Sequence, residues 1–155
     1  MEVKIKTMAV DIITEINILR PREQVSHYAC DPDHAPNWYV NIKTVEWETP
    51  KPLQVGSRIA FVAQFLGRRL AYTYEIVELK VGERMVMRTV QGPFPMETTY
   101  TWESLTPTTT RMVLRNRGEP KGFSILMAPL MAMAMRRANQ KDLSLLKRIL
   151  ESSGN

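Results

Sequence analysis

The fold of this chain is restricted above all by a series of short segments in which apolar and polar residues alternate. In the clearest of them, from Met96 to Leu105, Met96, Tyr100 and Trp102 share one face with Thr98, while glutamate and threonine occupy the other face. Such alternation is typical of a strand with one covered and one wet face. Because the turns between the segments are short, neighbouring strands are expected to pair antiparallel. The predicted strands cover residues 8–19, 42–48, 58–66, 69–79, 84–91, 96–105 and 110–116.

Helical segments are expected in two places. A short helix at residues 22–29 and a second short helix or turn at residues 33–39 follow the first strand, with breaks at Arg20-Pro21 and Asp31-Pro32. A long helix runs roughly from Phe123 to Ser152, because apolar residues recur there at helical spacing. Pro129 lies either in its first turn or at a kink.

This order of elements predicts an α+β fold with an internal cavity. Each predicted strand has one apolar face, and the long helix is the element available to cover it. A twisted antiparallel sheet of about seven strands curls around such a helix, and one helix cannot fill the concave side. Cavities of this kind bind small apolar molecules. The residues expected to contact such a ligand are Trp38, Phe61, Tyr72, Tyr74, Met85, Met87, Met96, Tyr100, Met112, Met127, Met131 and Met135.

Methionine is unusually frequent in the chain, with ten residues against four phenylalanines and five tyrosines. Seven of the ten fall on faces assigned to the interior, on both the sheet and the long helix. Methionine side chains are flexible and adapt to irregular partners. Methionines that face each other from the sheet and from the long helix would line an adaptable ligand cavity. Ordinary core packing remains the alternative.

The chain resembles the START-related helix-grip superfamily, also called SRPBCC, and most closely its polyketide cyclase/dehydrase-like members. The resemblance spans nearly the whole chain and implies a single helix-grip domain over residues 1–155. It does not decide the function, because the superfamily includes lipid carriers, coenzyme Q-binding proteins, hormone receptors, co-chaperones and aromatase/cyclases. The motifs that carry it are Ile16-Asn17-Ile18 leading to Pro21-Arg22-Glu23-Gln24-Val25, Asp31-Pro32 followed by Trp38, Val55-Gly56-Ser57, and Asp142-Leu143 through Leu146-Lys147 to Leu150-Glu151.

Metal and cofactor chemistry is not expected. His27 and His34 are the only histidines, and Cys30 and Asp31 lie between them, but no zinc-binding spacing is present. Glycine loops that cradle phosphate and the nucleophile motif of serine hydrolases are also missing from the sequence. We therefore predict neither a metal site nor a bound cofactor.

Two residues are weak candidates for proton transfer in the cavity. His34 precedes Trp38 by four residues, so both side chains could face the cavity mouth from one short helix. Tyr100 carries a hydroxyl on an inward face. No activated carboxylate is evident, because most glutamates lie on faces assigned to solvent. This favours binding over catalysis.

The charge is asymmetric along the chain. The net charge is +5, the pI is about 9.5, and basic residues outnumber acidic ones between Arg111 and Arg148. This segment is interpreted as a solvated face that could attract an anionic partner, and no nucleic-acid motif accompanies it. Membrane contact is considered only as transient, through Gly92-Pro93-Phe94-Pro95 and Phe123. Monomer and homodimer are both left open.

The location expected for the chain is the cytoplasm. Cys30 is the single cysteine, which fits a reducing compartment, and the N-terminus lacks the apolar run of a signal peptide. The longest apolar run, at residues 125–135, is much shorter than the roughly 20 residues that span a bilayer.

The predicted function is binding or transport of a hydrophobic small molecule, which could be lipid-like, isoprenoid or polyketide-like. Two alternatives remain open. One is an enzyme of the polyketide cyclase/dehydratase type. The other is a co-chaperone or ribosome-interaction module, suggested by the basic C-terminal segment.

Overall fold

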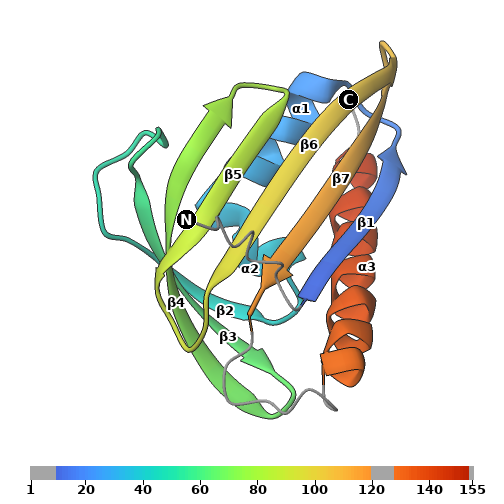
Figure 1. The fold of residues 1–155 in the computed structure, drawn as a ribbon. Coiled ribbons are helices and arrows are strands. Elements are labelled where there is room, and N and C mark those ends of the chain that lie inside the picture. Colours follow the sequence, from blue (N-terminus) through green and yellow to red (C-terminus); the bar gives the residue numbers. More distant parts are fainter. Residues whose placement is uncertain (1–9, 120–127, 154–155) are drawn as a thin grey trace, which may run out of the picture.

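The computed structural model describes residues 10–119 and 128–153. One curved sheet and one long helix dominate the fold, and short helices follow the first strand (Figure 1). The elements are β1 (Val10–Ile18), α1 (Arg22–Cys30), a 3-10 turn (Pro32–His34), α2 (Ala35–Trp38), β2 (Ile42–Trp47), β3 (Arg58–Phe65), β4 (Arg68–Lys80), β5 (Arg84–Gln91), β6 (Met96–Thr106), β7 (Thr109–Gly118) and α3 (Ala128–Ser152).

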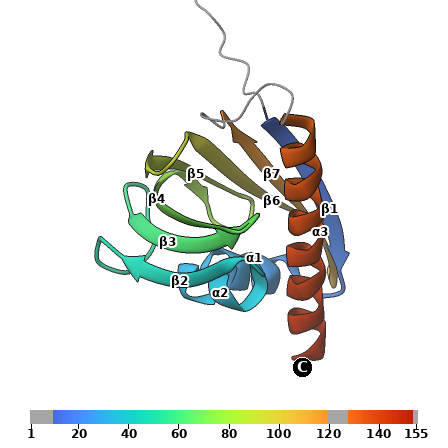
Figure 2. The ribbon, with the colours of Figure 1, turned by 90° about the horizontal axis from the view of Figure 1, so that it is seen from below.

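The seven strands form one antiparallel sheet in the order β1-β7-β6-β5-β4-β3-β2. Strand β1 pairs with β7 from Val10 opposite Gly118 to Ile18 opposite Thr110, so the first and last strands of the chain are neighbours. Figure 2 shows the sheet curling from β1 to β2, with α3 beside β1 and the short helices across the open side. The predicted helix-grip fold is confirmed. Strand ends differ from the predicted ones by one or two residues within the described part of the chain.

The short helices begin and end where the local sequence dictates. Pro21 is the extended N-cap of α1, with Glu23 in the first turn, and Asp31 ends the helix. The Asp31 side chain then accepts a hydrogen bond from the Asp33 N–H at 2.9 Å, which starts the 3-10 turn. The second short helix or turn predicted at residues 33–39 corresponds to this 3-10 turn, which ends at His34, and to α2 over Ala35–Trp38.

Helix α3 contributes most of its apolar face to the interior. Pro129 lies in the first turn of the helix as described, where its missing N–H costs nothing, so it does not kink the helix. Leu143, Leu146 and Leu150 are buried, and α3 packs along β1. The predicted helix start at Phe123 lies outside the described residues. Within the described residues, no helix is long and apolar enough to cross a membrane.

The convex face of the sheet carries paired charges. Arg115 meets Asp11 at 2.6 Å, and Glu97 lies between Arg88, 2.6 Å away, and Arg117. Glu97 is on the outer face as expected, but the two arginines bury it to 8% exposure. The strands thus keep these ion pairs outside and most of their buried apolar residues on the concave side.

Candidate functional site

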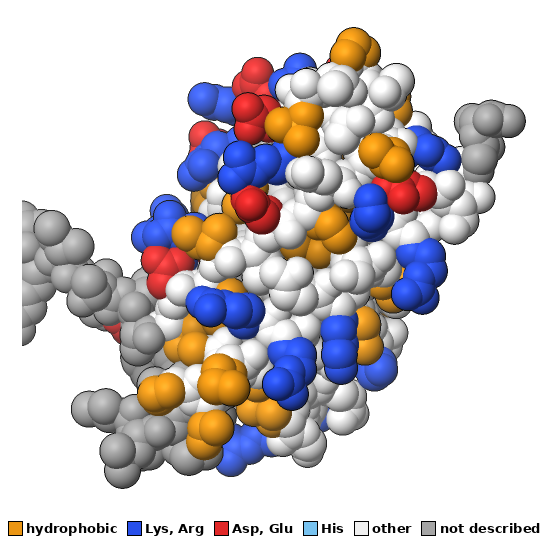
Figure 3. All heavy atoms as spheres, turned by 90° about the vertical axis from the view of Figure 1, so that its right-hand side faces the viewer, with side chains coloured by type: hydrophobic (Ala, Val, Ile, Leu, Met, Phe, Trp, Pro, Cys, Tyr) orange, Lys and Arg blue, Asp and Glu red, His pale blue; other side chains and the backbone are white. Residues whose placement is uncertain are grey.

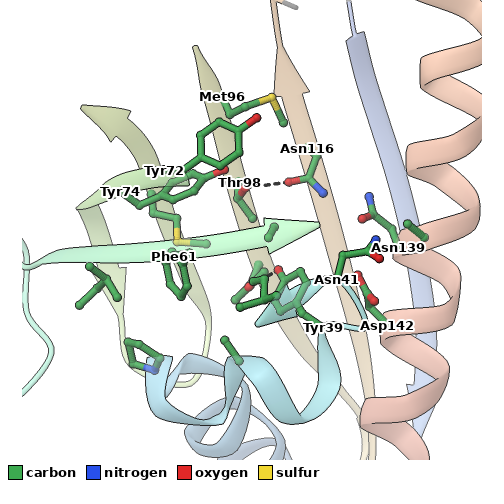
Figure 4. Close-up of a pocket in the computed structure, with 18 of the residues that line it drawn as sticks. Tyr39, Asn41, Phe61, Tyr72, Tyr74, Met96, Thr98, Asn116, Asn139 and Asp142 are labelled. Carbon is green, nitrogen blue, oxygen red and sulfur yellow. Dashed lines mark hydrogen bonds between the residues drawn. The ribbon is translucent and has the colours of Figure 1, made fainter. Parts of the chain in front are cut away.

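A cavity of about 170 Å³ lies between the concave face of the sheet, the short helices and α3 (Figure 4). A single helix leaves this space because the sheet curls away from it. Of the twelve predicted ligand contacts, ten line the cavity, whereas contact with a ligand remains a prediction. The ten are Trp38, Phe61, Tyr72, Tyr74, Met85, Met87, Met96, Tyr100, Met131 and Met135.

The other two predicted contacts are not part of this lining. Met112 is fully buried opposite Ile16 and Trp102, but it does not border the cavity. Helix α1 contacts both β6 and β7, and Met112 belongs to the buried core cluster. Met127 lies outside the described residues.

His34 does not line the cavity either, which corrects the prediction that it shares the face of Trp38. Its ring stacks on Tyr28 with centroids 4.0 Å apart, and its Nδ1 lies 3.0 Å from the Tyr28 carbonyl oxygen. The 3-10 turn changes the residue spacing per turn, so the i, i+4 relation of a regular helix does not hold. His34 is thereby removed from the candidates for proton transfer in the cavity.

One side of the cavity is an apolar wall built by β3, β4, β5, β6 and α3. Tyr72 meets the ring of Phe94 edge-on at 5.8 Å, and Phe61 meets Tyr74 edge-on at 5.9 Å. Phe94 is 7% exposed, so its ring faces the interior rather than a membrane surface. We call this set the apolar wall: Phe61, Tyr72, Phe94, Met85, Met87, Met96, Met131 and Met135.

Polar groups gather at the opposite side of the cavity, where α2, the start of β2 and α3 meet (Figure 4). Asn139 and Asp142 lie three residues apart on the inward face of α3, so the helical repeat places both side chains toward the same space. The Val40 N–H donates a hydrogen bond to Asp142 Oδ1 at 2.9 Å, and the hydroxyls of Tyr39 and Tyr100 are hydrogen bonded to each other. We call this set the polar end: Tyr39, Asn41, Tyr100, Asn139 and Asp142.

One donor at the polar end has no partner among the described residues. Asn139 is 6% exposed, and its Nδ2 is buried without a hydrogen bond to any of them. An unpaired buried donor costs free energy unless water or a ligand satisfies it. An oxygen atom of a ligand is a suitable acceptor for this group.

The electrostatics of the polar end favour neutral groups. Burial raises the pKa of Asp142 to about 7, and the hydrogen bond from Val40 only partly opposes this effect. Burial also holds the pKa values of Tyr39 and Tyr100 well above the usual tyrosine range. Near neutral pH the carboxyl of Asp142 therefore exchanges a proton, while both phenols stay protonated.

Asp142 corrects the expectation that the cavity holds no activated carboxylate. The sequence did contain a signal for it, because Asp142 interrupts the apolar stripe of α3 four residues after Ala138 and four before Leu146. A charged residue in the middle of a buried stripe is rare unless it is paired or functional. Asn139, three residues before Asp142 on the same face of α3, is a second polar residue of the cavity that the sequence analysis did not identify.

A second polar pair lies between the wall and the polar end. The Thr98 hydroxyl donates a hydrogen bond to Asn116 Oδ1 at 2.7 Å, across the neighbouring strands β6 and β7. Both residues are buried and border the cavity. The bond leaves the Asn116 amide nitrogen as a further donor near the ligand space.

The model of the family described as polyketide cyclase/dehydrase and lipid transport matches residues 9–151. The chain belongs to this family. Its solved neighbours share the START-like fold. Among them, the protein TTHA0849 from Thermus thermophilus has 20% identity and a TM-score of 0.81, with 94% of this chain and 99% of that chain covered.

Two further neighbours carry functional or superfamily names. A START superfamily protein from Mycobacterium smegmatis has 14% identity and a TM-score of 0.80, with 92% of this chain and 97% of that chain covered. The Zhui aromatase/cyclase from Streptomyces sp. R1128 has 13% identity and a TM-score of 0.77, with 91% and 93% covered. At these identities the likeness shows the fold alone. No curated protein matches the chain in sequence.

In this member of the polyketide cyclase/dehydrase and lipid transport family, the described residues offer no metal site. No three His, Cys, Asp or Glu side chains among them are grouped to hold an ion. Cys30 borders the cavity, and burial raises the pKa of its thiol to about 12, so it is a poor nucleophile. The described lining supplies hydrophobic contact, hydrogen bonding and proton exchange at Asp142. The description of the family fits hydrophobic-ligand binding or polyketide cyclase-like roles.

Proposed function

We propose that the protein binds a hydrophobic small molecule with one polar group, and that the ligand lies across the cavity with this group at the polar end. The supporting observation is the division of the cavity into an apolar wall and a polar end that holds an unpaired donor, Asn139 Nδ2. Apolar contact supplies the affinity, and a few placed polar groups fix the orientation. Lipid-like, isoprenoid and polyketide-like molecules with a carbonyl or hydroxyl group meet this description.

The volume limits the size of the ligand. An apolar cavity of about 150 Å³ accepts benzene, so about 170 Å³ suits a compact ring compound. The five methionines in the wall have flexible side chains, and their rotation is the means by which a longer ligand would fit.

The binding experiment compares naphthalene with β-naphthol, which adds one hydroxyl to the same carbon frame. Protein with ¹³C-labelled methionine methyl groups is titrated with each compound. We expect the signals of Met87 and Met131 to shift. The signal of Met133 should stay in place, because this side chain is 62% exposed on the outer side of α3. Unchanged Met87 and Met131 signals, or shifts at Met133 alone, would contradict binding in the cavity.

A second candidate is an enzyme of the cyclase/dehydratase type, favoured by the position and pKa of Asp142. In a dehydration, a base takes a proton from the carbon next to a carbonyl, and an acid gives a proton to the departing hydroxyl, which leaves as water. Asp142 exchanges a proton near neutral pH and faces the cavity beside the Tyr39–Tyr100 pair. It replaces His34 as the candidate acid or base.

The catalytic candidate is tested with the β-hydroxyketone formed from benzaldehyde and acetone, whose dehydration gives a conjugated, ultraviolet-absorbing product. Turnover by the protein that disappears in Asp142→Asn and persists in His34→Ala would support it. If the wild-type protein turns over the hydroxyketone no faster than Asp142→Asn does, but still binds β-naphthol, the result would favour a binding protein without catalysis.

A further inference from the structure

The outward side of α3 combines exposed apolar and basic residues along one line. Positions three or four residues apart on a helix lie on the same side, and the members of this line follow that spacing. Leu130 and Met133 are 58% and 62% exposed, and because they are three residues apart on the helix, the two large apolar side chains lie next to each other on its outer side. We call this line the outer stripe of α3: Leu130, Met133, Arg137, Lys141, Ser144 and Arg148.

The cations of the outer stripe have no carboxylate partner in the part of the chain that the structure describes. Within the described residues, Arg137, Lys141 and Arg148 take part in no ion pair, and neither does the neighbouring Arg136. Of the two acidic residues in the helix, Asp142 is buried at the cavity and Glu151 is paired with Lys147.

The convex face of the sheet is different. There Arg111 is paired with Glu15, and Arg115 with Asp11. The outer side of α3 therefore carries positive charge without paired carboxylates, whereas these two arginines on the convex face of the sheet are paired. Figure 3 faces this side of the molecule and shows hydrophobic side chains gathered at its lower end, with basic side chains above them.

We propose that the outer stripe of α3 docks the protein on an anionic membrane surface. A helix surface with lysine and arginine beside exposed apolar side chains is suited to the membrane interface, where the cations meet lipid phosphates and the apolar tips enter the headgroup region. A nucleic acid would use the cations but not Leu130 and Met133. Binding in the cavity does not require this docking, so the proposal goes beyond the proposed function.

The position of the stripe adds a consequence for ligand exchange. Met131 and Met135 lie in the same turns of α3 as Leu130 and Met133 but face the cavity. When the outer stripe lies on lipid, one helix diameter, on the order of 10 Å, separates the membrane surface from the cavity. An apolar ligand would then pass between the two with a short path through water.

The test is flotation of the full chain with vesicles. We expect binding to phosphatidylcholine vesicles that contain phosphatidylglycerol, weak binding to pure phosphatidylcholine, and a decrease with added salt. The variant Arg137→Gln/Lys141→Gln/Arg148→Gln should lose affinity by about fivefold for each cation removed. The variant Leu130→Ser/Met133→Ser should also weaken binding, because the apolar tips no longer enter the interface.

The control is Lys80→Gln/Val81→Ser, at the last residue of β4 and the first residue of the turn after it, which also removes one exposed cation and one exposed apolar side chain. It should bind like the wild type, and circular dichroism should show that all variants are folded. Equal binding to both kinds of vesicle, or equal losses in the control, would overturn the proposal. So would binding to poly-uridylate that depends on the three cations while vesicle binding is absent.

Discussion

The apolar wall and the polar end of the cavity are held in place by different means. The wall consists of methionines and rings that meet through apolar contacts, as Tyr72 and Phe94 do. At the polar end, Asp142 is tied to the Val40 N–H and Tyr39 to Tyr100. Hydrogen bonds fix direction, whereas methionine contacts tolerate changes of shape. The comparison indicates that the wall selects a ligand by apolarity and the polar end selects it by orientation.

The largest expected effect concerns the support of the polar end. Trp38 is fully buried and contacts the rings of Tyr39, 4.1 Å away, and Tyr100, 5.8 Å away, between centroids. Trp38→Ala should lower the free energy of unfolding by about 3–5 kcal/mol, because it leaves a large hole that the neighbours cannot fill. Urea unfolding measures this loss of unfolding free energy. Trp47→Ala, at a half-buried surface site, is the control and should cost clearly less; equal losses would show that the polar end is not rigidly supported.

The next effect is a pH dependence that belongs to Asp142. Its pKa rises from 3.8 to about 7 on folding, so between these pH values the folded protein holds a proton that the unfolded chain has released. Stability therefore falls as pH rises through this interval and is constant above it, a loss of about 4 kcal/mol. Asp142→Asn keeps the acceptor for Val40 but has no proton to lose. It should lack this decline in urea unfolding measured between pH 4 and pH 8.

Asp33 supplies the control for this pH dependence. Hydrogen bonds from Lys51 and Trp47 lower its pKa in the folded protein. The stability that it contributes is present above its unfolded pKa and is lost as pH falls, which is the opposite sign. A decline that survives in Asp142→Asn would mean that another group causes it.

The two regions also differ in how far the sequence could predict them. The wall follows from alternation along strands, which places Phe61, Tyr72 and Met87 inward without knowledge of any tertiary contact. The polar end depends on where α3 meets the start of β2, and that contact joins Val40 to Asp142 across about a hundred residues. Alternation along strands could not show this contact, and the only local signal for Asp142 is that it interrupts the apolar stripe of α3.

The predictions for Met112 and His34 were also wrong, the first because of packing between elements distant in sequence and the second because of local turn geometry. Met112 has the buried face that alternation predicts, but it packs in the core cluster away from the cavity, which no local pattern reveals. His34 was placed by helical spacing, and the 3-10 turn over Pro32–His34 directs its ring to Tyr28 instead. The fold was predictable from periodicity, whereas these positions required the packing of one element on another.

A smaller effect separates orientation from apolarity in binding. Asn139→Leu removes the unpaired donor and should weaken β-naphthol binding about three- to tenfold, which corresponds to the net value of one hydrogen bond. Binding of naphthalene should not weaken, because this ligand has no acceptor. Fluorescence titration measures both. Gln140→Leu, on the exposed side of the same turn, is the control; a loss of naphthalene affinity equal to that of β-naphthol would refute an orienting role.

The smallest effect is expected at the apolar wall. Met87→Leu/Met131→Leu keeps volume and apolarity, so stability and naphthalene affinity should change little. Leucine has fewer rotatable bonds, so the wall adapts less, and the longer ligand anthracene should lose more affinity than naphthalene. Met112→Leu, in the core but away from the cavity, should leave the ratio of the two affinities unchanged. If the ratio also stays constant in the double variant, the methionines serve only as packing, and the difference between a soft wall and a fixed polar end disappears.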